Sequence, residues 1–76
     1  MTKEEFINTI KKHTELRLKE YPYLRYGQTI FNEVAIRWNK AARDAQFNYG
    51  VDCFYDDNKV DEFLDVCWGI ISEEFL

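Results

Sequence analysis

Carboxylates are the side chains that this sequence gathers most densely, and such groups can bind metal ions or exchange protons. Five of them lie close together at positions 52–62: Asp52, Asp56, Asp57, Asp61 and Glu62. A calcium loop needs oxygen ligands at alternate positions, whereas the alternate positions after Asp52 include Phe54 and Val60. A magnesium site needs only one or two carboxylates with a phosphate ligand, but helix capping explains the cluster more simply. We therefore expect no metal and no cofactor.

Side chains suited to catalysis are scarce. His13 is the only histidine and Ser72 the only serine, so neither a zinc site of about four ligands nor a nucleophile with a neighbouring base can be assembled from the sequence. Cys53 and Cys67 are typical of small buried apolar residues. Because no secretion signal opens the chain, we expect both thiols to stay reduced in a cytoplasm. The sequence predicts a protein that is not an enzyme.

Composition indicates one soluble globular domain over residues 1–76. Apolar residues make up 46% of the chain and aromatic residues 17%, and ten basic residues oppose fourteen acidic ones for a net charge of -4. No apolar run approaches the ~20 residues of a membrane span. The acidic balance argues against a nucleic-acid partner, which usually meets a basic face.

Helical periodicity and sparse Gly and Pro divide the chain into three segments. The first runs from Thr2 to Tyr21: Thr2 and Glu5 form a capping-box pattern, and Pro22 ends the helix. The second begins between residues 24 and 29 and ends near residue 47, before Gly50, with an apolar stripe at Ile30, Phe31, Val34, Ala35, Trp38, Ala41, Ala42 and Ala45.

The third segment has the cleanest amphipathic pattern. Asp56, Asp57 and Asn58 supply capping candidates for its start. Apolar residues then recur at helical spacing: Val60, Phe63, Leu64, Cys67, Trp68, Ile71 and Phe75. Gly69 interrupts this helix and is a candidate for close approach of another helix. The predicted fold is all-α, a small three-helix bundle with an ordered loop between helices 2 and 3.

Charge is distributed unevenly along the chain. Residues 1–51 hold nine bases and six acids, a net of +3, whereas residues 52–76 hold one base and eight acids, a net of -7. Asp57, Asp61 and Asp65 recur four residues apart and so form an acidic row on one face of the third helix. Two alternatives explain this row: basic side chains from the first two helices reach across to it, or it faces a basic partner.

Two short blocks resemble a known family. Residues 24–32, LRYGQTIFN, resemble the R-x-G-Q-x-x-F-N signature of small phage and prophage proteins, and residues 50–57, GVDCFYDD, resemble their G-x-D-P-F-Y-D-D block. Together the blocks anchor residues 24–63, and Cys53 stands where the family usually has proline. The family has no assigned activity. The resemblance therefore implies a phage or prophage origin and expression in a bacterial cytoplasm, and nothing about chemistry.

The two blocks also suggest a structural joint, which we favour over a ligand site. Gly27 can let the connector pass close to another element or adopt positive φ. Gln28 and Asn32, one helical turn apart, are expected to bond the backbone of the loop from Asp52 to residue 57. Phe54 and Tyr55 are expected to insert that loop into the open end of the bundle.

These observations lead to a first functional hypothesis: a small phage-type protein that binds a host or phage macromolecule. The acidic row of Asp57, Asp61 and Asp65, with Glu62, would steer a basic protein surface, and Tyr23 and Tyr55 would anchor it. A sharper version is an inhibitor of a host nuclease or defence system that mimics nucleic-acid charge. The alternative is a structural homodimer whose acidic third helix packs on the basic half of its mate.

Overall fold

The first helix, α1 (Lys3–Glu20), begins and ends at the expected signals. The structure is a computed structural model and describes residues 1–74. The Thr2 hydroxyl accepts the Glu5 amide at 3.1 Å, and the Glu5 carboxylate accepts the Thr2 amide at 2.9 Å. These reciprocal bonds lower the pKa of Glu5 and satisfy the first free amides of the helix. The Tyr21 amide closes the last turn on the Arg17 carbonyl, directly before Pro22.

The expected second helix is broken in two, so residues 1–74 form four α-helices rather than three. Helix α2 (Tyr26–Arg37) and helix α3 (Asn39–Phe47) are separated by Trp38, whose backbone leaves the helical conformation at φ -135° and ψ 68°. The Trp38 ring packs edge-on against Phe6 with centroids 5.3 Å apart. The break gives α3 its own direction, so α2 packs on α1 while α3 reaches α4.

The connection from α3 to the last helix is ordered. Gly50 adopts φ 66°, a conformation that side-chain-bearing residues avoid, and the chain then turns so that the Val51 amide bonds the Ala45 carbonyl at 2.9 Å. The Asp56 carboxylate accepts the Asn58 amide at 3.0 Å and caps a short 3₁₀ turn, Asp57–Lys59. Helix α4 (Val60–Glu74) follows directly, which confirms that the predicted capping residues start the last helix.

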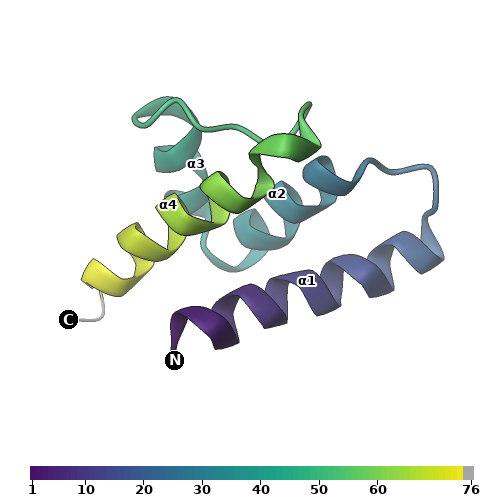
Figure 1. Ribbon diagram of the computed structural model, residues 1–76, viewed down its shortest axis with the longest axis horizontal. Coiled ribbons are helices and arrows are strands. Elements are labelled where there is room, and N and C mark those ends of the chain that lie inside the picture. The colour runs from purple at the N-terminus through teal and green to yellow at the C-terminus, as the bar shows by residue number, and fades with distance from the viewer. Residues whose placement is uncertain (75–76) are drawn as a thin grey trace.

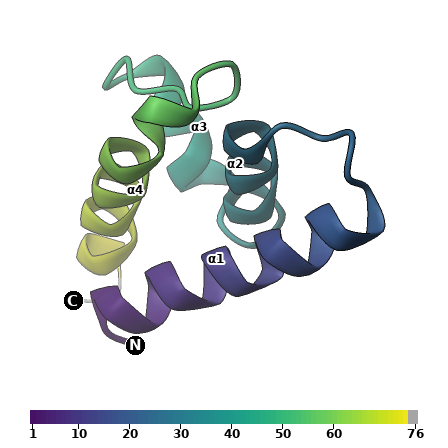
Figure 2. The same ribbon diagram turned by 45° about the vertical axis from the view of Figure 1, so that its right-hand side comes forward.

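The helices enclose one aromatic and aliphatic core. Figures 1 and 2 show α1 running across one side of α2 and α4, with α3 on the far side of that pair. The Phe31 and Phe63 rings join α2 to α4 with centroids 5.3 Å apart. The fully buried apolar side chains include residues of all four helices: Phe6, Ile10, Ile30, Val34, Ala42, Ala45, Phe63, Leu64 and Ile71. Phe75, expected on the stripe of the last helix, lies outside the described residues.

Gly69 does not serve the close contact suggested by the sequence. It lies exposed on α4, and a Cβ at this position would meet no neighbouring atom within 4 Å. Among residues 1–74, no helix combines the length and the apolar character that crossing a membrane requires.

Both thiols lie inside the core, which confirms their interpretation as buried apolar residues. Cys53 and Cys67 are fully buried, and burial raises the pKa of each thiol to about 12. The Cys53 thiol also donates to the Gly27 carbonyl at 3.2 Å. Neither sulfur can reach the thiolate form that reacts with electrophiles while the core stays closed.

We therefore predict that a disulfide reagent at mildly alkaline pH labels neither cysteine in the native protein and both in concentrated guanidinium. Mass spectrometry of the labelled chain gives the readout. A Lys12→Cys variant, which places a thiol on an exposed position of α1, is the control and should label at once. Rapid labelling of native Cys53 or Cys67 would show that the core opens at that site.

Candidate functional site

Gly27 is the centre of the predicted joint. Its amide donates to the Asp57 carboxylate at 2.8 Å, and its carbonyl accepts the Cys53 thiol. A Cβ on Gly27 would overlap the Cys53 carbonyl oxygen and lie 3.0 Å from the Asp57 carboxylate. Of the two uses that the sequence suggests for this glycine, close approach is therefore the one observed: the start of α2 touches the loop backbone.

Two further joint residues behave as expected. The Asp52 carboxylate accepts the Phe54 amide and the Gln46 side-chain amide, both at 2.8 Å, so it folds the loop and ties it to α3. The Phe54 ring meets Phe31 edge-on at 5.8 Å, which inserts the loop into the end of the bundle.

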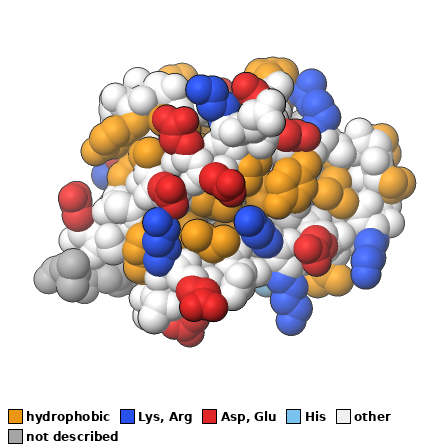
Figure 3. Space-filling view, viewed as in Figure 1, with side chains coloured by type: hydrophobic (Ala, Val, Ile, Leu, Met, Phe, Trp, Pro, Cys, Tyr) orange, Lys and Arg blue, Asp and Glu red, His pale blue; other side chains and the backbone are white. Residues whose placement is uncertain are grey.

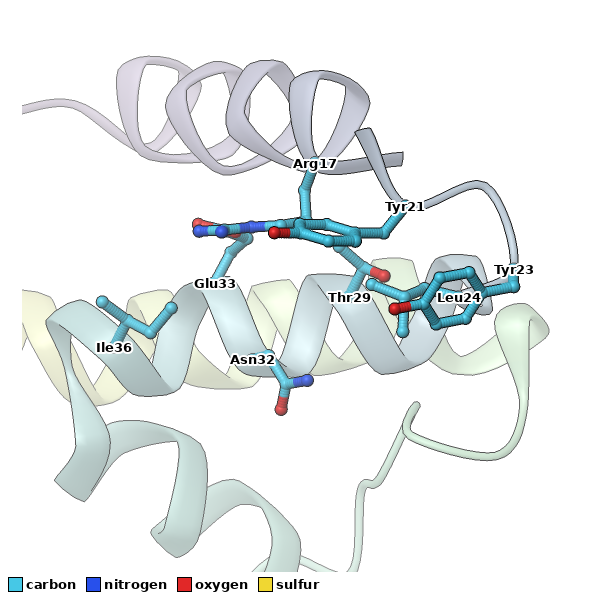
Figure 4. Close-up of a pocket in the computed structure, with 8 residues that line it drawn as sticks. All are labelled: Arg17, Tyr21, Tyr23, Leu24, Thr29, Asn32, Glu33 and Ile36. Atoms are coloured by element: carbon cyan, nitrogen blue, oxygen red, sulfur yellow. The ribbon is translucent and has the colours of Figure 1, made fainter. Parts of the chain in front are cut away.

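Gln28 and Asn32 do not join the loop, contrary to the sequence-based expectation. Neither side chain makes a hydrogen bond within residues 1–74. The loop bonds to the Gly27 backbone instead, so the joint needs no amide side chain from the next turn of α2. Asn32 is exposed and points away from α1 (Figure 4).

The acidic row is paired within the chain. Lys3 contacts Asp65 at 2.8 Å, and Lys11 lies 3.9 Å from Asp61, so α1 supplies basic partners for α4. The third member, Asp57, accepts the Gly27 amide described above. Of the two alternatives left by the sequence, reaching across from the first helix is the one observed.

This pairing removes the reason for treating the row as a mimic of nucleic-acid charge. Such a mimic presents acidic groups without neighbouring cations, whereas Figure 3 shows basic side chains interleaved with acidic ones across the face formed by α1 and α4. The ion pairs themselves are exposed and contribute roughly 0–1 kcal/mol each. Glu62, the fourth expected member of this surface, is exposed.

Tyr23 and Tyr55, the expected anchors, are among the most exposed large side chains, at 79% and 76%. Tyr55 therefore does not insert into the bundle as expected of it: the Arg25 guanidinium carbon lies 4.9 Å from its ring centroid, a cation–π contact, and the Phe54 ring centroid lies 4.8 Å from the Tyr55 centroid. Tyr23 contacts only the Tyr21 ring among the aromatic side chains described, with centroids 6.1 Å apart.

A buried carboxylate is the feature that sequence reasoning missed. Glu33 on α2 is 1% exposed, although a glutamate four residues before an arginine, here Arg37, is typical of a solvated helix face. One carboxylate oxygen accepts the Arg17 Nε at 3.0 Å and the other accepts the Arg37 Nη1 at 2.8 Å. Arg37 also donates to the Glu33 carbonyl at 2.9 Å.

The two guanidiniums keep Glu33 ionised. Burial alone would raise the pKa of this carboxyl, but the hydrogen bonds from Arg37 and Arg17 outweigh it and hold the pKa below its ordinary value. The same bond raises the pKa of Arg17. A signal for this site exists in α1: Arg17 follows Ile10 and Thr14 at helical spacing, on the face that packs inward.

A hollow of about 320 Å³ lies beside this cluster, and we call it the α2 groove (Figure 4). Its floor is one stripe of α2, with Arg17 and Tyr21 along one side. Its lining consists of Arg17, Tyr21, Tyr23, Leu24, Thr29, Asn32, Glu33 and Ile36. The groove offers guanidinium and amide donors between apolar side chains, which is suited to binding rather than to proton transfer, because both oxygens of its carboxylate are already engaged.

Within residues 1–74, no three His, Cys, Asp or Glu side chains are grouped as a metal site would require. No family model, curated protein or solved structure matches the chain. The resemblance of residues 24–32 and 50–57 to phage proteins therefore stays a prediction.

Glycine substitutions test the joint. We predict that Gly27→Ala destabilises the fold by roughly 1–3 kcal/mol, because the added Cβ overlaps the Cys53 carbonyl. Gly69→Ala is the matched control: open space surrounds the site, so the better helix former should stabilise α4 by about 0.5–1 kcal/mol. Urea denaturation followed by circular dichroism measures both. Equal effects of the two changes would contradict the close contact at Gly27.

Acidification tests the Glu33 cluster. Because the pKa of Glu33 in the folded protein lies below that of an ordinary glutamate, the stabilisation is present above the ordinary pKa and is lost as pH falls through the folded-state pKa. We expect Glu33→Gln to cost about 1–3 kcal/mol at neutral pH. The difference in the free energy of unfolding between the parent protein and Glu33→Gln should shrink in acid, where Glu33 protonates in the parent protein.

Thermal melts over a pH series provide this measurement. Glu15→Gln, which alters an exposed carboxylate on the neighbouring helix, is the control and should stay within about 0.5 kcal/mol of the parent protein. If the stability difference between Glu33→Gln and the parent protein stayed constant with pH, the arginines would not be holding the carboxylate ionised.

Proposed function

We propose that this protein is a non-enzymatic binding protein that engages another protein through exposed aromatic side chains at the start of α2. The observation that carries the proposal is the exposure of Tyr23 and Tyr55, at 79% and 76%: Tyr23 lies shortly before α2 in the chain, and Tyr55 contacts Arg25, the residue that precedes the helix. Tyrosine is enriched among the residues that dominate binding energy at protein interfaces, because its ring buries a large area at low entropic cost.

The closed core makes this exposure informative. The accessible surface is 4926 Å², and a monomeric protein of 9.2 kDa exposes about 4,900 Å². The chain thus packs as completely as a stable monomer while leaving these rings in water. For that reason we favour a separate partner over the structural homodimer.

The resemblance to small phage and prophage proteins supports a setting for this function. We propose a host or phage protein as the partner and the cytoplasm of a bacterial host as the location. The paired acidic row gives no support to a partner with a basic surface, so anchoring by aromatic rings stands in place of charge steering.

Binding to a purified partner tests this proposal. Proteins captured from a bacterial lysate by the tagged chain would be identified, purified and titrated by calorimetry. We predict that Tyr23→Ala and Tyr55→Ala each weaken binding by roughly 10-fold or more. Tyr49→Ala, which removes a ring of similar exposure at the end of α3, should leave affinity unchanged.

Salt and a second set of variants separate the rival surfaces. Asp61→Asn with Asp65→Asn removes two acidic charges without touching the Gly27 joint, and we expect little change in affinity. If binding fell steeply with salt, or were lost in this double variant alone, the acidic row would be the binding surface instead. Self-association in sedimentation with no captured partner would favour the homodimer instead.

A further inference from the structure

The α2 groove has the dimensions of a short peptide site. Thr29, Asn32, Glu33 and Ile36 are spaced i, i+3, i+4 and i+7, so they form one stripe along α2. Seven residues of helix span ~10 Å, which matches about three residues of extended chain.

Apolar side chains mark both ends of this stripe. Ile36 is 66% exposed at one end, and Tyr23 and Leu24 lie at the other (Figure 4). An exposed isoleucine on a helix whose own apolar stripe is fully used contributes nothing to the core. These two ends therefore supply the apolar contacts that a bound segment would bury.

In the middle of the groove, Arg17 has hydrogen-bond donors without a partner in the described chain, whereas both oxygens of the Glu33 carboxylate are engaged. Both oxygens of Glu33 are used by Arg17 and Arg37. Arg17 spends only its Nε on this contact, its side chain is 44% exposed, and its two terminal nitrogens have no acceptor within residues 1–74. Glu20 attracts Arg17 electrostatically but forms no ion pair with it in the described chain.

We propose that the α2 groove binds a protein segment that carries an aspartate or glutamate next to an apolar side chain. The partner's carboxylate accepts from the terminal nitrogens of Arg17, and its apolar side chain packs against Ile36 or the Tyr23 end. This assignment rests on the proposed function and names the chemistry of the segment that the partner presents.

A protein segment fits these contacts better than a nucleic acid does. Phosphates would satisfy the Arg17 donors and Tyr23 could stack on one base, but the aliphatic Ile36 at the other end of the groove offers no ring for a second base. The net charge of -4 also opposes the approach of a polyanion. A guanidinium flanked by apolar side chains instead matches the charge and shape of an acidic–apolar peptide.

A displayed library of random peptides tests the assignment directly. We expect panning against the intact protein to enrich sequences with Asp or Glu beside an aliphatic or aromatic residue. A synthetic peptide from the enriched set should bind at least ~10-fold more weakly to Ile36→Lys and to Arg17→Gln. Phe47→Lys and Lys12→Gln, exposed changes outside the groove, are the matched controls and should bind as the parent protein does.

The same peptide with its acid replaced by the amide completes a double-mutant cycle. We expect the amide peptide to lose affinity for the parent protein but to lose nothing further on Arg17→Gln. Arg17→Lys keeps the charge without the planar fork and should fall between the two. Circular dichroism melts establish that each variant is folded before its affinity is compared, and Ile36→Lys provides the test if Arg17→Gln is not.

Each other result overturns the assignment. Enriched peptides without an acidic bias, binding indifferent to Ile36→Lys, or an oligothymidylate that competes with the peptide would each remove the groove as an acidic-peptide site. If a captured partner still binds through Tyr23 or Tyr55 but ignores the groove variants, the proposed function stands and only the groove assignment fails. If no partner binds at all, the proposed function fails with it.

Discussion

The charged contact between α1 and α2 is the constraint on which the α2 groove depends. Glu33 is almost wholly buried and stays ionised only while Arg17 and Arg37 both hold it. Because Arg17 comes from the last turns of α1, that helix must lie where its guanidinium reaches α2. The same placement brings Tyr21 alongside α2 (Figure 4). The α2 groove is therefore a consequence of how a buried charge is neutralised.

The opposite end of α2 is fixed by a different kind of contact. At Gly27 the backbone of the helix meets the backbone of the loop, and Asp57 and the Cys53 thiol bond its amide and carbonyl. Asp57 opens the 3₁₀ turn that leads into α4. This joint thus sets where α4 starts relative to α2, and the Trp38 break then lets α3 pack on α4. Close contact at one helix end and a break at the other account for the arrangement of α2, α3 and α4.

The features that could be predicted from the sequence are those decided by neighbouring residues. Thr2 and Glu5 bond each other across three positions, and Asp56 caps two residues ahead, so their patterns suffice. The Trp38 break could not be predicted, because the apolar period runs through it and neither Gly nor Pro marks it. The Trp38 ring packs against Phe6, which lies 32 positions earlier in the chain, and local sequence patterns carry no record of so distant a contact.

Glu33 escaped sequence reasoning for a related reason. A glutamate four residues before an arginine is typical of an exposed helix face, and only the approach of α1 buries it. The existence of the Gly27 joint could be predicted, because a residue without a side chain allows close approach and the loop of residues 50–57 has backbone groups to satisfy. Its bonding partners could not, because the loop side chains Asp57 and Cys53 bond the helix backbone at Gly27, whereas helix side chains were expected to bond the loop backbone.

The uneven charge of the two halves is resolved by folding, and this changes what the surface can mean. Lys3 and Lys11 come from the positive half and meet Asp65 and Asp61 of the negative half. The charge asymmetry along the sequence suggested a docking surface, but in the folded protein the opposite charges pair with each other. Folding gives no comparable account of the exposed Tyr23 and Ile36, which add nothing to the core. A surface feature that the fold does not use is the stronger indication of a partner, and here that feature is apolar.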